Sequence, residues 1–256
     1  MTTPESKPGP VIEMQDLSFG SMQDPRSSVA EHIDWTVNAG DYWIVAGLQG
    51  SGKSDFLMVT GGVMSPLAGS YRLFGEQMPI FEDARLHTRL RLGLVFADGQ
   101  LLNNLTVRKN VALPLRYHRN LGKAEAEPAV NALLEAMELA PWADSTPGAL
   151  SRNWQQRAGL ARAVMLQPEV LLVDNPLGGL DLRHTGWWLG FLEQLSKGHP
   201  LLGGQPITLV VTTADLRPWK SRGQQFAILR NRQFSVFGTL AQLEAANEQL
   251  LQELFE

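Results

Sequence analysis

The chain has 256 residues, of which 44% are hydrophobic and 19% charged, and its formal net charge is −4. This length suits one large α/β domain, or a core domain with a small inserted subdomain. The acidic balance gives no electrostatic reason to expect a nucleic-acid partner, and the absence of cysteine excludes disulfides and thiolate metal sites.

The N-terminal half begins with a polar segment. Residues 1–10 contain prolines and no apolar run, which excludes a signal peptide and predicts a disordered arm. No later run approaches the roughly 20 apolar residues that cross a bilayer, so we expect a soluble protein that reaches a membrane only through a partner. Short apolar runs between turn residues then predict strands. These strands cover residues 11–14, 33–37, 42–46 and 92–96, with a further short strand between two turns within 66–75.

The second half alternates between helical and strand patterns. One helical pattern runs from residue 105 to about 139, with apolar positions spaced for a single face. Strands that alternate with helices indicate a largely parallel sheet. The remaining predicted elements are helices over 151–165 and 182–196, strands over 170–173 and 207–212, a hairpin over 226–237 and an amphipathic segment over 240–255.

A phosphate-binding loop is predicted between the third strand and the first helix, where the sequence matches Gly-x-x-x-x-Gly-Lys-Ser. Its glycines would let backbone N–H groups curl around phosphates, and the helix N-terminus adds partial positive charge. We expect Lys53 to reach the β- and γ-phosphates of ATP and the Ser54 hydroxyl to ligate Mg²⁺. The octet consists of Gly47, Leu48, Gln49, Gly50, Ser51, Gly52, Lys53 and Ser54.

A second Mg²⁺ ligand is predicted at the end of a buried strand. Three apolar residues lead into Asp174, which places a carboxylate at the carboxyl edge of the sheet. An aspartate at this position often caps a helix instead. The preceding phosphate loop favours the metal role.

The segment between the phosphate loop and Asp174 resembles a known protein family. Residues 150–163 read LSRNWQQRAGLARA, which resembles the signature segment of ABC ATPases, an LSGGQ-type loop followed by a QRxxLARA helix. Asp174 follows at the separation usual in that family. Residues 176–181, which end at Asp181, look like its D-loop, and residues 105–111 resemble the helix that opens its helical subdomain. The resemblance covers about residues 11–245.

The resemblance implies a P-loop NTPase fold, in which a RecA-like parallel sheet core carries an antiparallel β subdomain and an inserted helical subdomain. Residues 11–238 would form this ATP-binding domain, with the helical subdomain at about 98–165. Residues 239–256 would form a C-terminal helical tail. By position Phe19 resembles the aromatic that stacks on adenine, although an ordinary strand aromatic is the alternative.

The resemblance also implies partners. ABC ATPases form head-to-tail dimers in which ATP lies between the phosphate loop of one subunit and the signature loop of the other, here Ser151, Arg152 and Asn153. We expect a homodimer or a heterodimer with another ABC ATPase subunit, attached to an integral-membrane permease. The chain would then lie in the cytoplasm, on the inner face of the cell membrane. Residues 105–118 and 238–243 also look like the ATPase subunits of bacterial lipid-trafficking (Mla-type) systems, so lipid is the preferred cargo.

The sequence departs from the family at the positions that carry the chemistry. Asn175 occupies the position of the general-base glutamate, and an amide cannot take a proton from water. Thr213 takes the place of the switch histidine, unless the correspondence slips by one residue. Ala97 takes that of the Q-loop glutamine, for which Gln100 is a candidate substitute. Arg152 and Asn153 replace the two signature glycines.

These departures lead to a hypothesis about activity. Side chains at 152 and 153 would obstruct the approach of the signature loop to a partner's ATP, although Arg152 could offer its own charge to the γ-phosphate. The alternative for Arg152 is a surface residue without a role. We expect a transport subunit that binds ATP but hydrolyses it slowly. The alternative is a non-hydrolysing regulatory or scaffold subunit that pairs with a competent ATPase chain.

Overall fold

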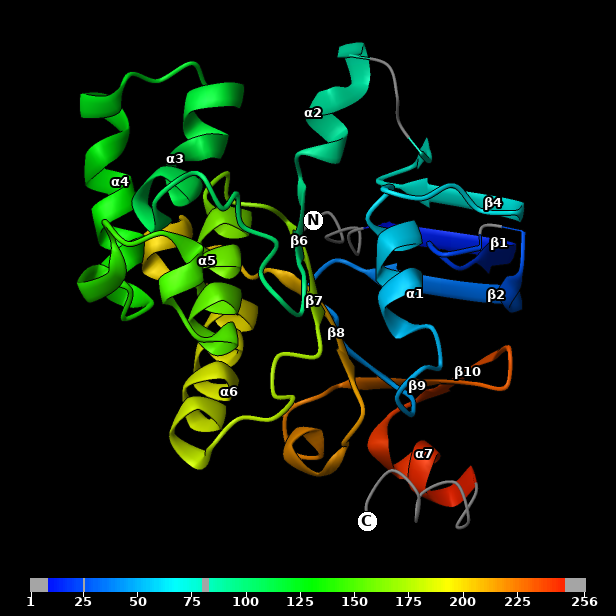
Figure 1. Cartoon of the computed structure of the whole chain (residues 1–256). Coiled ribbons are helices and arrows are strands. Elements are labelled where there is room, and N and C mark those ends of the chain that lie inside the picture. The colour runs from blue at the N-terminus through cyan, green and yellow to red at the C-terminus, as the bar shows by residue number, and fades with distance from the viewer. Residues whose placement is uncertain (1–8, 25, 80–82, 247–256) are drawn as a thin grey trace, which may run out of the picture.

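A computed structural model describes residues 9–24, 26–79 and 83–246. The fold has three layers (Figure 1): a central parallel sheet with helices α3–α6 on one side, and α1 with a second, antiparallel sheet on the other. This arrangement confirms the predicted α/β fold class, with a parallel core sheet and an antiparallel β unit.

The central sheet has the strand order β10-β9-β3-β8-β7-β6. All neighbours in it are parallel except β10, which pairs antiparallel with β9 in the predicted hairpin. Every residue of β3, β7 and β8 is buried, as expected for strands covered on both faces. The strands are β3 (Tyr42–Ala46), β6 (Leu92–Val95), β7 (Val170–Asp174), β8 (Thr208–Thr213), β9 (Gln225–Arg230) and β10 (Gln233–Gly238).

The antiparallel sheet has the order β2-β1-β4-β5. Its strands are β1 (Pro10–Gly20), β2 (Ser28–Asn38), β4 (Ala68–Leu73) and β5 (Glu76–Gln77). Because β1 begins at Pro10, the predicted disordered arm over residues 1–10 is wrong at that residue. Residues 1–8 of the predicted arm lie outside the described residues, as do residues 247–256 of the predicted C-terminal tail.

The helices are α1 (Lys53–Thr60), α2 (Leu86–Arg89), α3 (Val107–His118), α4 (Lys123–Ala136), α5 (Arg152–Val164), α6 (Leu182–Lys197) and α7 (Leu240–Ala246). Helices α3, α4 and α5 pack against one another and form the upper left of Figure 1. The assignment of 98–165 to an inserted subdomain, within a domain spanning 11–238, stays a prediction.

One predicted helix is two. The helical pattern over 105–139 is interrupted between α3 and α4, where Asn120 has a φ of 52° and Gly122 takes the N-cap position with the carboxylate of Glu125 accepting its N–H at 2.7 Å. Asparagine tolerates the left-handed region, and such a residue ends a helix. The apolar face continues through both helices, which explains why the periodicity alone does not reveal the break.

Two hydrophobic cores hold the layers together. Phe56 and Leu57 of α1 join one face of the central sheet to the antiparallel sheet. On the other face, α5 and α6 pack over β7 and β8, with Trp188 fully buried. The neighbouring Trp187 is only partly buried against this core. None of the helices within the described ranges is both long enough and apolar enough to cross a bilayer.

Candidate functional site

The loop from β3 to α1 has the shape of a cradle. Gly47 and Gly52 are sterically required, because an added Cβ on Gly47 would lie 2.5 Å from the carbonyl oxygen of Leu229, and one on Gly52 would collide with Val29. Gly50 and Gly52 have φ values of 80° and 94°, a region that favours glycine. No side chain caps the start of α1, so the first-turn N–H groups remain available to an anion.

Lys53 turns back over this loop. Its side chain is 8% exposed, and its Nζ donates to the carbonyl oxygens of Gly47 at 2.7 Å and Leu48 at 2.8 Å. Burial lowers the pKa of Lys53, while the nearby Asp174 raises it in part. A phosphate placed in the cradle would oppose the burial effect and favour the charged ammonium.

Asp174 and Ser54, which lie 120 positions apart in the sequence, meet at the carboxyl edge of the sheet. The Ser54 hydroxyl donates to Oδ2 of Asp174 at 2.7 Å, and the Thr212 hydroxyl donates to Oδ1 at 2.8 Å. Parallel pairing of β7 with β8 sets Asp174 opposite Thr212. Gln156 of α5 fixes the same strand end, since its Nε2 donates to the carbonyl oxygen of Asp174 at 2.8 Å.

These residues fit ATP with Mg²⁺. The loop, Asp174 and the segments that follow β6, β7 and β8 line one open cavity of about 500 Å³, within the usual range for a ligand site. Magnesium takes oxygen ligands, usually one or two from protein and the rest from phosphate and water. Ser54 and Asp174 supply such oxygens. Among the described residues, no cluster of three or more His, Asp or Glu could hold a metal by itself.

Three of the positions that depart from the family pattern, Ala97, Arg152 and Asn175, line this cavity. Asn175 lies beside Asp174 with a φ of 42°, and its backbone N–H donates to both oxygens of Thr212. Ala97 and Ala214 contribute to the same wall. Within the described ranges, the lining of the cavity contains no histidine or glutamate.

Two sequence assignments require correction here. Thr213 is buried, and its hydroxyl is occupied by the indole N–H of Trp219 and the backbone of Asp215. The residue that faces the cavity is therefore Ala214, which is the one-residue slip considered above. Gln100 is not among the lining residues, so it does not substitute for Ala97.

The signature segment begins α5 at the edge of the cavity. Ser151 is the exposed N-cap residue, and Arg152 extends from the first turn so that its Nε donates to the carbonyl oxygen of Ala97 at 3.1 Å. Asn153 instead points inward, where its Oδ1 accepts the indole N–H of Trp188 at 3.1 Å. The expectation that both side chains obstruct the loop surface is therefore wrong for Asn153; only Arg152 protrudes.

The D-loop adjoins the signature segment. Asp181 caps α6, accepting the backbone N–H of His184 at 2.9 Å, and this bond lowers the pKa of the carboxyl. Asp181, Asn175 and the three signature residues line a second cavity of about 430 Å³ beside the first. Arg152 and Asn175 belong to both cavities.

Phe19 does not reach the site. Its ring is fully buried in the core and lies 6.1 Å from that of Phe56, centroid to centroid. The assignment of Phe19 to adenine stacking is therefore wrong, because no face of the ring is open. The alternative, an ordinary strand aromatic, agrees with this burial.

Sequence reasoning missed Thr212, Gln156 and Ala214. Thr212 ends a predicted buried strand, and a hydroxyl at that place is a signal for a contact with the neighbouring strand end. Gln156 belongs to the Gln-Arg pair of the signature helix, and the motif alone does not show that its side chain contacts the end of β7. Ala214 has a methyl side chain without a polar group, so nothing in the sequence marks it as a residue of the site.

Comparisons with known proteins agree with this geometry. A family model described as ABC transporter matches residues 30–178. The methionine import ATP-binding protein MetN of Lacticaseibacillus paracasei is 30% identical over 96% of this chain and 68% of its own length. The intermembrane phospholipid transport system ATP-binding protein MlaF of Escherichia coli K12 is 30% identical over 92% of this chain and 84% of its own. An ATP-binding cassette solved as a dimer in a post-hydrolysis state with ADP and Pi superposes with a TM-score of 0.75, at 25% identity, covering 87% of this chain and 95% of that one.

Proposed function

The chain belongs to the ABC transporter family, and on that premise we propose that it is the ATP-binding subunit of a transport complex that binds ATP·Mg²⁺ at the β3–α1 loop and hydrolyses it slowly. The observation that carries the proposal is the contact between the Ser54 hydroxyl and Asp174 at 2.7 Å beside the buried Lys53 ammonium. A hydroxyl, a carboxylate and an ammonium converge there on a loop of free N–H groups, which is an arrangement for a nucleotide phosphate and its cation.

Binding would use the residues in separate roles. The glycines of the loop and the start of α1 present N–H groups to the phosphates, and Lys53 exchanges its carbonyl contacts for phosphate oxygens. Ser54 and Asp174 hold the Mg²⁺, which neutralises phosphate charge when bound. Thr212 and Gln156 keep Asp174 in place.

Slow hydrolysis follows from what surrounds the reacting phosphate. A general base must accept a proton from water, and Asn175 cannot. Ala97 and Ala214 have methyl side chains, which neither position water nor carry charge. Asp55 is the other carboxylate of the cavity lining, and its Oδ1 is engaged with the backbone N–H of Met22 at 2.9 Å. The cavity therefore has binding groups without a base placed for attack.

We further propose a complex of two such ATPase subunits, alike or different, with an integral-membrane permease, on the cytoplasmic face of the cell membrane. The similarity to MetN and MlaF, which are named for import and phospholipid transport systems, and the dimeric cassette structure support this proposal. Similarity to MlaF over 92% of the chain favours lipid as the cargo. A non-hydrolysing regulatory subunit paired with a competent ATPase chain is the second candidate, favoured by the same missing base.

Arg152 provides a test of whether the signature loop contributes to its own chain's site. Because Arg152 lines the cavity together with Lys53 and Asp174, we expect Arg152→Ala to weaken ATP·Mg²⁺ binding by the isolated chain about 10-fold, the scale of a charge-assisted hydrogen bond. Arg183→Ala removes an exposed arginine outside that cavity and should leave the affinity unchanged. Isothermal titration would measure both. If Arg152→Ala and the wild type bind ATP·Mg²⁺ with equal affinity, Arg152 does not contact the nucleotide bound by its own chain. A role for Arg152 would then remain only at the nucleotide bound by a partner subunit.

The experiment that tests the proposed function is a measurement of ATP·Mg²⁺ binding and of phosphate release on one preparation of the chain. Saturable binding with little phosphate release supports an ATP-binding subunit that hydrolyses slowly. Absence of binding rejects the proposal.

A further inference from the structure

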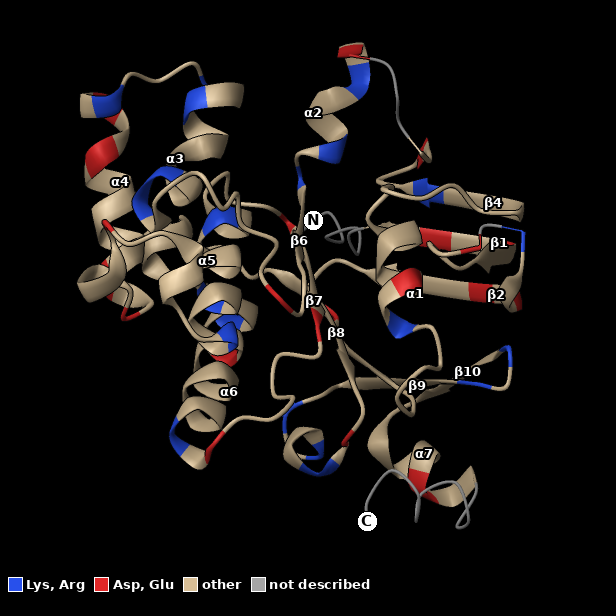
Figure 2. Ribbon diagram, viewed as in Figure 1, with Lys and Arg blue, Asp and Glu red and all other residues tan. Residues whose placement is uncertain are grey.

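A third cavity lies far from the nucleotide site, between α3 and α4. It encloses about 110 Å³ and is open on one side. Four of its eight lining residues are basic, and one is acidic. Figure 2 shows basic residues on α3 and at the start of α4, although the chain as a whole is acidic. The lining consists of Arg108, Lys109, Ala112, Arg116, Lys123, Ala126, Glu127 and Val130.

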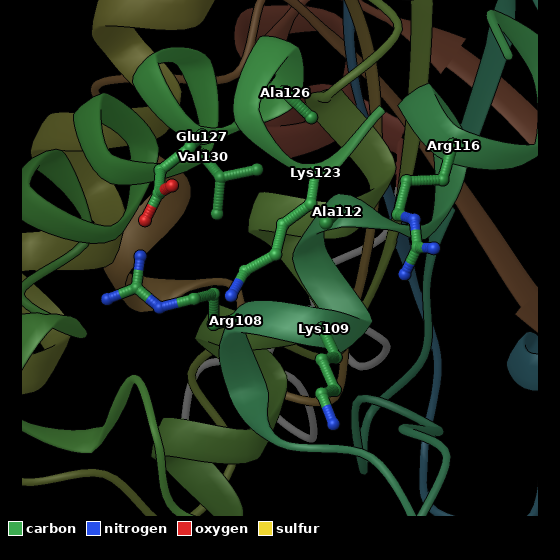
Figure 3. Close-up of a pocket in the computed structure, with 8 residues that line it drawn as sticks. All are labelled: Arg108, Lys109, Ala112, Arg116, Lys123, Ala126, Glu127 and Val130. Atoms are coloured by element: carbon green, nitrogen blue, oxygen red, sulfur yellow. The ribbon is translucent and has the colours of Figure 1, made fainter. Parts of the chain in front are cut away.

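The groove combines a cationic rim with an apolar floor. Figure 3 shows Arg108, Lys123 and Glu127 directed toward the gap between the helices, with Arg116 on its other side. Ala126 and Val130 are each 1% exposed and form the floor with Ala112. Because two of these floor residues are alanines, the helices leave room for a ligand.

The positive charge of the rim is largely unneutralised. In the part of the chain that the structure describes, neither Lys109, Arg116 nor Lys123 lies within ion-pair distance of a carboxylate, and Glu127 has no basic partner. Arg108 alone is engaged, with Asp144 at 3.4 Å and with Asn131. Like charges held around an apolar hollow repel one another, and an anion placed among them would relieve that repulsion.

From this arrangement we propose that the α3–α4 groove binds the phosphate headgroup of an anionic lipid at a membrane surface. A small, highly hydrated anion gains nothing from the alanine and valine floor, whereas an amphiphile places its glycerol and first methylenes there. Tyr117, which is 81% exposed and adjoins Arg116, is the residue type enriched at membrane–water boundaries. The groove would attach the chain to anionic membrane in addition to any permease contact.

The test is co-sedimentation of the full chain with vesicles of phosphatidylcholine alone and vesicles that also contain phosphatidylglycerol. We expect binding to the second kind only, weakening as salt screens the surface. Arg116→Gln with Lys123→Gln should lower the partition coefficient about 20-fold, since each basic side chain near an anionic surface contributes roughly fivefold. The matched control, Arg72→Gln with Arg232→Gln, removes two exposed charges elsewhere and should bind as the wild type does.

Two further experiments distinguish lipid binding in the groove from nonspecific adhesion to an anionic surface and from binding of free phosphate. Ala112→Leu fills the floor without changing any charge and should weaken vesicle binding, with its melting temperature recorded as a check of folding. Inorganic phosphate, compared with chloride at equal ionic strength, should not compete. Equal binding to both vesicle types, equal loss in the Arg72/Arg232 control, or displacement by inorganic phosphate would overturn the proposal. ATP affinity should be unchanged in Arg116→Gln/Lys123→Gln, so failure of this inference is distinguishable from failure of the nucleotide site.

Discussion

Replacing Asn175 with glutamate should raise the ATP turnover of the purified chain about 100-fold. General-base catalysis contributes roughly 10²–10⁴-fold, and we expect the low end because Ala97 and Ala214 remain in the cavity wall. The residue stands directly beside Asp174 at the end of β7, so a carboxylate there would adjoin the predicted phosphate position. Steady-state phosphate release measures the change.

The matched control is Asn175→Gln, which has the length of glutamate but cannot accept a proton. Both substitutions place a longer side chain at a φ of 42°, where asparagine is favoured over other residues at a cost of order 1 kcal/mol. The pair therefore shares any backbone strain and differs in basicity. Equal turnover in the two variants, with ATP binding preserved, would show that the missing base is not what limits hydrolysis.

Lys53→Ala should reduce ATP·Mg²⁺ affinity about 100-fold or more. It removes the only ammonium among the described residues that line the nucleotide cavity, and hydrogen bonds to charged groups contribute roughly 1.5–3 kcal/mol each. Equilibrium titration with ATP in the presence of Mg²⁺ measures the loss.

Lys53 also holds the loop in its present shape through the carbonyls of Gly47 and Leu48. Lys53→Met keeps most of the apolar stem and serves as a second variant with less disturbance of packing. We expect both to bind ATP weakly while their thermal unfolding stays close to that of the wild type. Wild-type affinity in Lys53→Met would mean that this ammonium does not contact the phosphates.

The sequence predicts the architecture around the phosphate loop because that motif constrains the backbone directly. The glycine spacing requires positive φ values and close approach, and the structure has both at Gly52. The meeting of Ser54 with Asp174 follows from a general property of parallel sheets, whose strand ends gather at one edge. These predictions needed no knowledge of side-chain packing.

The predictions that are wrong depend on side-chain direction. Phe19 lies in a stretch of β1, residues 17–20, in which every residue is buried, so its burial is set by the elements packed on both sides of the strand. Asn153 turns inward because Trp188, on a different helix, has an indole N–H that needs an acceptor. Thr213 and Ala214 differ by one position at a strand end, where only the surrounding residues show which of them faces the cavity.

The α3–α4 groove has no sequence signature either. Its basic residues lie at intervals in two helices, and the sequence shows one continuous helical pattern across them. The break between His118 and Lys123 folds the chain back, and this places Arg116 and Lys123 on the same hollow. The groove therefore becomes visible only when the break is known.

The most direct test of the central claim is a single-turnover measurement on the wild-type chain. The protein is saturated with ATP·Mg²⁺, separated from free nucleotide, and the bound nucleotide is identified after increasing times. We predict that saturable binding occurs and that the bound nucleotide remains ATP long after the Asn175→Glu variant has converted it to ADP. Conversion to ADP by the wild type as fast as by that variant would contradict the account.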